Sequence, residues 1–171
     1  ERIIRSLNHQ ESDIIPYHTD FTWQEAKRMQ EYTGDKDFEQ KYGFHIIQAG
    51  YGKFEDVPGK PEHVIDEHGV EWNRSGADKD IGVVDHYLIE DLEENTYRFP
   101  PVLEKEFRAE IRSMLDKRED RFTVAGIGFS MFERAWSLHG MENVLMDMLL
   151  YPEELDKLLD EICEYNERLI D

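Results

Sequence analysis

The sequence predicts an α/β fold with a parallel sheet that is interrupted by a β-hairpin. Three observations support this prediction. Strand-like and helix-like segments alternate along most of the 171 residues, the strand candidate at 122–128 is apolar throughout, and the stretch from about 62 to 90 has no helical period. Alternation of this kind favours a parallel sheet, but it fits a closed barrel and a doubly wound open sheet equally well.

The first part of the chain begins with alternating helix and strand candidates. In the strand candidate, Pro16 suggests a strand start or an exposed edge, because proline cannot donate to a sheet ladder. Thr22 and Glu25 have the spacing of a capping box, and Gly34 should end the helix that starts there. The predicted elements are a helix at 2–7, a strand at 14–20, a helix at 22–33 and a strand at 44–48.

The middle of the chain departs from this alternation. A loop rich in glycine and proline is expected at 50–61, and residues 63–73 have the pattern of a hairpin with its turn near Gly69. A further strand is expected at 81–89. We therefore interpret 62–90 as an excursion from the alternating pattern.

The last part of the chain is predicted to be mostly helical around one strand. Apolar residues from Leu103 to Leu115 recur at three- and four-residue spacing, which is typical of an amphipathic helix. Ser130 and Glu133 form a second capping-box pattern, and Pro152 suits the first turn of a helix. The predicted elements are a helix at 103–115, a strand at 122–128, and helices at 130–139, 141–150 and from 152 onward.

The composition excludes several classes of partner. The formal charge is −19 and the pI is near 4.7, which disfavours nucleic acid and anionic membrane surfaces. No apolar run is long enough to span a membrane, and the first residues are too polar for a signal peptide, so a cytoplasmic protein is expected. The single cysteine, Cys163, aligns with apolar helix positions and is predicted to be a core thiol.

Several segments together resemble the uroporphyrinogen decarboxylase superfamily. They are Glu1-Arg-Ile-Ile-Arg-Ser-Leu-Asn-His-Gln-Glu-Ser-Asp-Ile-Ile-Pro16, the Asp-x-x-Gly-x-x-Trp pattern from Asp66 to Trp72, and the segment from Gly128 to Asn143 with Asp147 and 151–155 after it. The resemblance implies a TIM-like (β/α)8 barrel. Such a barrel needs about 250 residues, so we expect residues 1–171 to be its N-terminal portion, an incomplete domain that is inactive alone and exposes apolar surface.

The superfamily carries out two reactions, the decarboxylation of uroporphyrinogen and methyl transfer involving a corrinoid protein. True decarboxylases hold the substrate carboxylates with arginines after the first proline, whereas the corresponding stretch here, 17–23, contains none. Methyl transfer is therefore favoured. It implies a small-molecule substrate of the methoxylated or methylamine-like kind, a corrinoid protein as partner, and zinc in the full-length protein, bound outside this chain. A decarboxylase with an altered pocket and a non-catalytic binding domain stay open as alternatives, as does a homo-oligomer.

Four residues are candidates for catalysis. His18 and Asp20 are two apart on a predicted strand and should share a face near its carboxyl end, where barrel enzymes collect catalytic residues. Glu133 and Arg134 follow the 122–128 strand at the same end. The alternatives are structural: Asp20 as a helix cap, His18 as a satisfied polar group, Glu133 in its capping box and Arg134 in an ion pair on the helix.

Three further residues are candidates for substrate binding. Gln48 would line the same mouth, and Phe129 and Trp136 lie on the Gly-Phe strand and the following helix, where the decarboxylase has its substrate tyrosine. For Gln48, as for His45, a structural role is the alternative. His63, His68 and His86 have no zinc-ligand spacing and are expected to be solvated. Gly126 and Gly128 lack the rest of a dinucleotide fingerprint, so no metal or nucleotide site is predicted within the chain.

Overall fold

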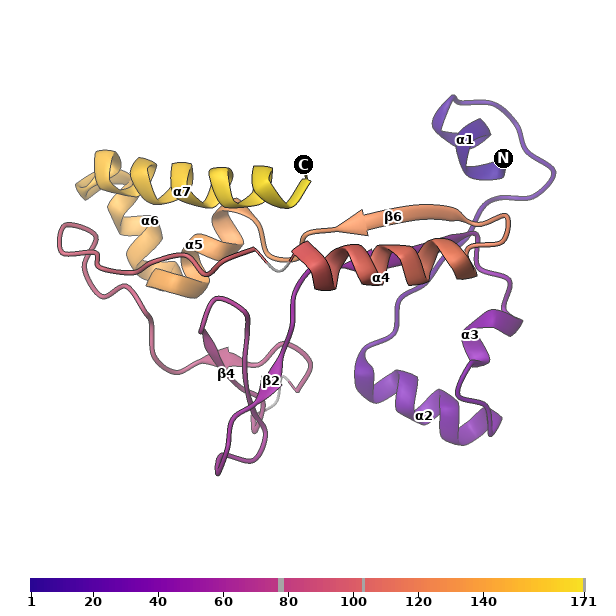
Figure 1. The fold of residues 1–171 in the computed structure, drawn as a ribbon, viewed down its shortest axis with the longest axis horizontal. Helices are drawn as coiled ribbons and strands as arrows, with labels where there is room; N and C mark the ends of the chain where they lie inside the picture. Colours follow the sequence, from indigo (N-terminus) through magenta and orange to yellow (C-terminus); the bar gives the residue numbers. More distant parts are fainter. Residues whose placement is uncertain (77–78, 103, 171) are drawn as a thin grey trace. The chain divides into compact units, whose positions relative to one another are not determined.

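The computed structural model describes residues 1–76, 79–102 and 104–170, and its ribbon is drawn in Figure 1. Leu103, the predicted helix start, lies outside these ranges. The chain divides into two compact units, which are described separately: unit 1 is Glu1–Gly50 with Lys105–Gly126, and unit 2 is Tyr51–Glu104 with Ile127–Asp171. The described residues are mixed α/β and form two small sheets but no closed barrel. None of their helices is long and apolar enough to cross a membrane.

Unit 1 contains four helices and two strands. The first helix has the predicted bounds. The second begins and ends as predicted: the Glu25 N–H donates to Oγ1 of Thr22 (3.4 Å), and Gly34 ends the helix with φ +66°. The Glu25 carboxylate instead accepts from Arg28 (2.6 Å). The elements are α1 (Arg2–Leu7), α2 (Trp23–Thr33), α3 (Phe38–Lys41), β1 (Ile46–Gly50), α4 (Glu104–Lys117) and β6 (Phe122–Gly126).

The two strands of unit 1 pair in parallel. Ile46 lies opposite Phe122, and the register continues to Gly50 opposite Gly126. The parallel strand predicted at 122–128 is thus confirmed, two residues shorter than expected. An apolar strand of this kind is expected to be covered on both faces, but most of its residues are only half-buried.

The strand predicted at 14–20 is absent from the described structure. This segment is extended, but its only backbone bond to β1 or its flanks runs from the His45 N–H to the Tyr17 carbonyl (3.1 Å). Pro16 has no N–H to donate, and Ile15 is 87% exposed. The segment therefore follows the strand without forming a ladder.

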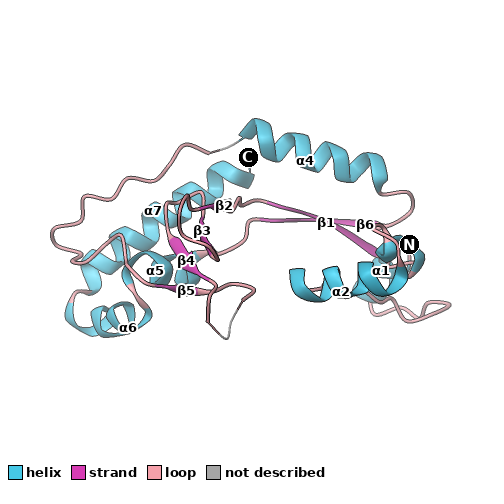
Figure 2. Ribbon diagram, turned by 90° about the horizontal axis from the view of Figure 1, so that it is seen from below, coloured by secondary structure: helices cyan, strands magenta, loops and turns pink. Residues whose placement is uncertain are grey.

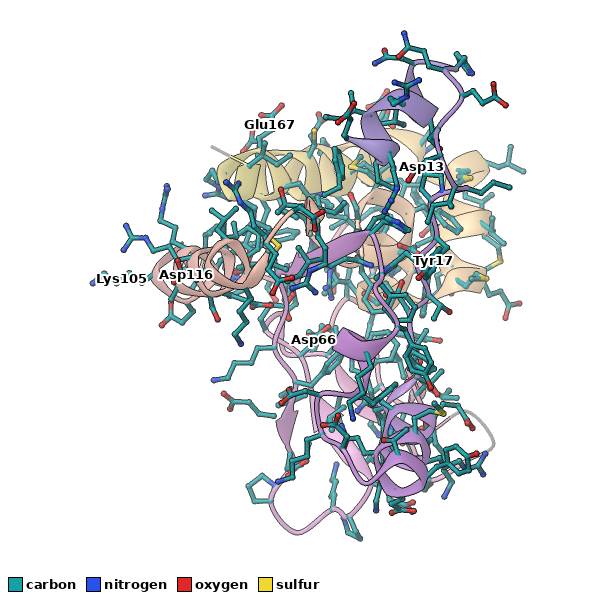
Figure 3. The ribbon with its side chains drawn as sticks, turned by 90° about the vertical axis from the view of Figure 1, so that its right-hand side faces the viewer. Asp13, Tyr17, Asp66, Lys105, Asp116 and Glu167 are labelled. Atoms are coloured by element: carbon teal, nitrogen blue, oxygen red, sulfur yellow. The ribbon has the colours of Figure 1, made fainter. Side chains whose placement is uncertain are left out.

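Helix α4 buries two residues of an apolar stripe. Phe107 and Met114, seven residues apart, are buried. Lys105 and Asp116 project outward from the helix (Figure 3), and a Glu110 carboxylate oxygen accepts from the Gly50 N–H at the end of β1 (3.2 Å). Figure 2 shows α4 running alongside β1 and β6.

Unit 2 combines a four-stranded antiparallel sheet with three helices. The hairpin predicted around Gly69 is confirmed, with His63 opposite Asn73. The strand expected at 81–89 is reduced to two residues, and one short strand arises inside the predicted 50–61 loop. The elements are β2 (Glu55–Asp56), β3 (His63–Ile65), β4 (Glu71–Asn73), β5 (Val83–Val84), α5 (Met131–His139), α6 (Met141–Leu150) and α7 (Pro152–Ile170), with sheet order β2-β3-β4-β5.

The core of unit 2 lies between the hairpin and the helices. Trp72 is fully buried and packs with apolar residues from both, among them Leu138 and Leu158. The prediction that Cys163 is a core thiol is wrong, because this residue is exposed. The buried stripe of α7 includes Leu158, Ile162, Tyr165 and Leu169, and Cys163 is rotated about 100° from Ile162 around the helix.

We predict that Gly140→Ala will destabilise unit 2 more than another glycine substitution with the same backbone requirement. Gly140 joins α5 to α6 with φ +96°, and a Cβ there would meet the Tyr87 ring at 2.7 Å. Backbone strain and overlap together should cost about 2–4 kcal/mol. Gly59→Ala is the matched control, because its φ is +79° but the space around it is open. Urea unfolding measures both; equal losses would exclude the steric part of the explanation.

Candidate functional site

Three of the sequence-predicted site residues meet in unit 1. Nε2 of His18 lies 3.0 Å from Oδ1 of Asp20, and Nε2 of Gln48 donates to the same oxygen (3.0 Å). The Gln48 and His18 nitrogens are themselves 2.9 Å apart. We call His18, Asp20 and Gln48 the unit 1 polar group.

The polar group forms because the extended 17–20 segment runs beside β1 in the same direction. Tyr17 lies beside His45, with its N–H donating to the His45 ring (3.1 Å), while Asp20 lies beside Gln48. The strand starts at Ile46 instead of Phe44, so Gln48 sits at its centre and does not mark its end. The two-residue spacing of His18 and Asp20 brings their side chains together even though the segment is not a strand.

The members of the polar group differ in exposure. The Asp20 side chain is 77% exposed, whereas that of His18 is 20% exposed and lies against the Phe44 ring, with centroids 5.4 Å apart. Both neighbours reach the same oxygen of Asp20, which leaves this carboxylate able to accept from a molecule in solution. The group presents negative charge and contains no arginine.

Unit 2 holds a second cluster, centred on Asp66. Oδ1 of Asp66 accepts from the backbone N–H groups of His68 (3.0 Å) and Val70 (2.9 Å), which shapes the turn of the hairpin. Oδ2 accepts from Nε1 of Trp72 (3.2 Å) and Nη1 of Arg134 (2.7 Å). The Asp-x-x-Gly-x-x-Trp pattern is therefore a buried clamp that joins the hairpin to α5, and Figure 3 labels Asp66 at its place in the fold.

The structural alternative for Glu133, a capping box, is wrong, whereas that for Arg134, an ion pair, is confirmed with a partner outside its own helix. Arg134 is buried and pairs with Asp66 across 68 positions of the chain, not with a residue on its own helix. Glu133 is exposed, and Ser130 caps nothing with its side chain, since its Oγ accepts from Asn166 (2.9 Å). A buried arginine with carboxylate partners is held by the fold, so substrate contact by Arg134 would require these ion pairs to open.

Phe129 and Trp136 pack against the clamp. Phe129 stacks on Trp72 with centroids 5.3 Å apart, and Trp136 meets Trp72 edge to face at 5.9 Å. Both are partly buried members of the unit 2 core. Their observed contacts are those of packing residues.

The prediction that His68 is solvated is wrong. Its side chain is 4% exposed, 3.7 Å from Glu67, and Tyr97 Oη donates to its backbone carbonyl (3.0 Å). Burial, assisted by the positive charge of Arg134, lowers the pKa of His68 to about 4. Burial also raises the pKa of Tyr165, whose hydroxyl is 2.9 Å from that of Tyr51. Sequence reasoning missed this cluster, and its one signal was the motif that begins at Asp66.

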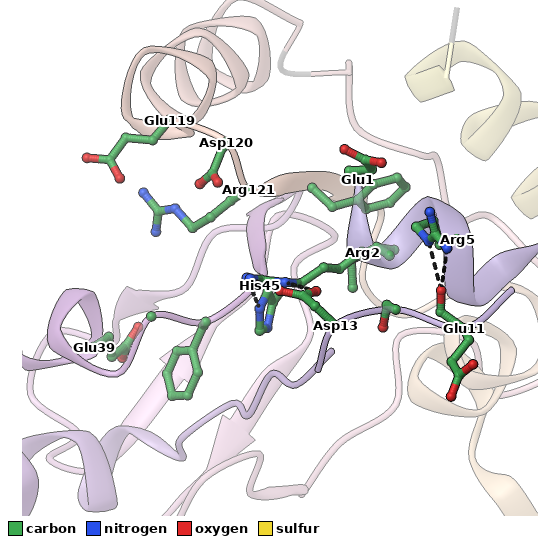
Figure 4. A pocket seen from close by; sticks show the side chains of 15 residues that line it. Glu1, Arg2, Arg5, Glu11, Asp13, Glu39, His45, Glu119, Asp120 and Arg121 are labelled. Atoms are coloured by element: carbon green, nitrogen blue, oxygen red, sulfur yellow. Dashed lines mark hydrogen bonds and ion pairs between the residues drawn. The ribbon is translucent and has the colours of Figure 1, made fainter. Parts of the chain in front are cut away.

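A cavity of about 890 Å³ opens within unit 1 at the amino ends of β1 and β6 (Figure 4). Two of its arginines are already engaged: Arg2 pairs with both oxygens of Asp13 (2.7 and 2.6 Å), and Arg5 donates to the Glu11 carbonyl. The Arg2 hydrogen bonds lower the pKa of Asp13 to about 2. The charged groups of Arg2 and Asp13 are thus paired with each other, whereas the Asp20 carboxylate is 77% exposed and can still accept hydrogen bonds, so the polar group is the better candidate despite the size of this cavity.

His63 is half-buried and His86 is exposed, and neither joins His68 in a metal site. Among the described residues, no three His, Cys, Asp or Glu side chains are grouped to hold a metal ion.

Comparison with known proteins adds no relative: no protein-family model, curated protein or solved structure matches the chain significantly.

Proposed function

We propose that this chain is part of a (β/α)8-barrel enzyme similar to the uroporphyrinogen decarboxylase superfamily, and that the enzyme transfers a methyl group from a methylated small molecule to a corrinoid. The observation that carries the choice of reaction is the unit 1 polar group. At the place where the decarboxylases have arginines, this chain presents Asp20, held by His18 and Gln48.

Two features support the barrel. The extended 17–20 segment, β1 and β6 run in one direction, and a helix follows the first and the last of them along the chain, whereas β1 is followed by the strands of unit 2. The Asp66 clamp also joins two of the family-like segments, since Asp66 and Trp72 belong to one and Arg134 to the other. A parallel arrangement and mutually satisfied motifs are what a barrel of this family requires.

Charge then selects the substrate class. Uroporphyrinogen carries eight carboxylates, which an exposed aspartate in a protein of charge −19 would repel. A neutral or cationic methyl donor, such as a methylated amine, meets no such repulsion and gives Asp20 a hydrogen bond or a charge to accept. In this proposal Asp20 binds the donor, while His18 and Gln48 hold the carboxylate in place.

Zinc does not fit the described residues by themselves. A catalytic zinc takes three protein ligands, and the polar group offers two donors of the usual kinds, His18 and Asp20. The proposal therefore assigns substrate binding to this group, and places the expected zinc outside it in the full-length protein. The corrinoid would supply the nucleophile that takes the methyl group.

The test uses the full-length gene product. With methylamines and methoxylated aromatics as donors, we expect methylcobalamin formation from cob(I)alamin, followed by absorbance, and about one zinc per chain. Asp20→Asn should lower the rate roughly 100-fold by weakening donor binding and orientation, whereas Asp35→Asn, which breaks the surface pair with Lys41, should not.

Other outcomes contradict the proposal in distinct ways. Loss of carboxylates from uroporphyrinogen would support the decarboxylase alternative. A folded full-length protein that contains no metal and shows neither reaction would support a binding domain. Equal rates for the two aspartate variants would remove the polar group from the site while leaving the reaction in place.

A further inference from the structure

Helix α6 turns its apolar side outward. Most of its ten residues are large and apolar, yet only Val144 and Asp147 are buried. Leu149 is 86% exposed, and the other exposed apolar side chains on this helix are Met141, Leu145, Met146, Met148 and Leu150. We call these six residues the α6 apolar face. Exposed apolar patches rimmed by polar residues mark interaction surfaces.

The orientation of α6 is fixed by polar contacts on its inner side. Oδ2 of Asp147 lies 2.7 Å from Nε2 of the buried His139, whose Nδ1 donates to the Ile89 carbonyl (2.8 Å). Asn143 donates to the His139 carbonyl (2.8 Å), and Val144 is in the core. Rotating the helix to cover its leucines would break these bonds and bury unpaired polar groups, so the apolar face remains outward.

The charge of the chain segment that contains this face indicates which partner suits it. Between Arg134 and Lys157 the chain has no lysine or arginine, whereas it has five acidic residues: Glu142, Asp147, Glu153, Glu154 and Asp156. Glu142, Glu153 and Asp156 are exposed. A second copy of this chain would bring these acids against their own equivalents, and an anionic lipid surface would be repelled as well.

We propose that the α6 apolar face is a docking site for a basic amphipathic helix. Leucine-like side chains on such a helix would pack on the methionines and leucines of α6, since methionine adapts to irregular apolar partners. Its lysines or arginines would face Glu142, Glu153 and Asp156. This inference does not depend on the reaction proposed above, but it rests on the α6 apolar face staying uncovered in the full-length protein.

The test uses a synthetic helical peptide made of leucine and lysine, with its leucines at helical spacing. Fluorescence anisotropy measures how tightly this peptide binds the protein. We expect Leu145→Gln with Leu149→Gln to weaken binding at least about tenfold, since truncating central apolar contacts removes most of the binding energy. Glu142→Gln with Glu153→Gln should weaken it and reduce its salt dependence. Ile170→Gln, at an equally exposed apolar residue of α7, is the control and should bind as the unaltered protein does. All of these positions are exposed, and circular dichroism checks that each variant folds.

Four results would overturn the proposal. The first would be that the peptide does not bind. The second would be that it binds the Leu145/Leu149 variant as tightly as the unaltered protein, which would mean that net charge alone attracts it. The third would be that a peptide with glutamate in place of lysine binds equally well. The fourth would be that light scattering shows a dimer of the unaltered protein but a monomer of the Leu145/Leu149 variant, which would make the α6 apolar face a contact between copies of this chain.

Discussion

Asp66→Ala is expected to destabilise unit 2 by about 3–5 kcal/mol, the usual cost of breaking one side of a buried ion pair. The substitution leaves Arg134 without its closest partner in a region where its side chain is 4% exposed. It also removes the acceptor of the His68, Val70 and Trp72 N–H groups. Arg134 already has one buried nitrogen, Nε, with no partner among the described residues. Chemical unfolding followed by tryptophan fluorescence measures the loss, because Trp72 reports directly on the clamp.

The matched control is Asp13→Ala. It breaks an Arg–Asp pair of similar length, Arg2 with Asp13 at 2.6 Å, but there the side chains are 41% and 62% exposed. Water replaces the lost partner of an exposed charge, so the free energy of unfolding should change little. A small effect of Asp66→Ala, comparable with that of Asp13→Ala, would show that the clamp does not hold unit 2 together.

Acid is expected to destabilise unit 2 through His68. The pKa of this residue is lowered to about 4 in the folded protein, chiefly by burial and then by Arg134, whereas the ordinary value is 6.5. Between about pH 6.5 and pH 4, His68 therefore binds a proton in the unfolded chain but stays neutral in the folded chain. Stability falls as pH drops from about 6.5 toward 4, by up to roughly 3 kcal/mol, and this contribution levels off below pH 4.

The measurement compares the free energy of unfolding between pH 7.5 and 5, where most carboxylates stay ionised. His68→Gln should remove the His68 part of the slope. Tyr97→Phe serves as the control, because it removes the hydroxyl bonded to the His68 carbonyl but keeps the ring that buries the histidine. The explanation fails if His68→Gln retains the slope of the unaltered protein.

The sequence by itself determined those features that depend on neighbouring residues. Thr22 and Gly34 delimit α2, and Pro152 begins α7, because caps and dihedral preferences act within one helical turn. The hairpin around Gly69 is equally local, since its strands are joined by a short turn. The contact of His18 with Asp20 follows from their two-residue spacing.

Only the tertiary structure decided which distant groups meet. No local signal pairs Arg134 with Asp66, 68 residues away, or places Gln48 beside Asp20. The spacing of residues along the sequence predicts a solvated His68 and a buried Cys163, but the structure has the reverse. Burial depends on what covers a residue: His68 lies under Phe99 and Tyr165, whereas Cys163 is one position beyond the stripe of α7 that faces the core. The 14–20 segment has a strand-like composition but forms no strand. A strand requires a full ladder of backbone hydrogen bonds to its neighbour, and this segment lacks one.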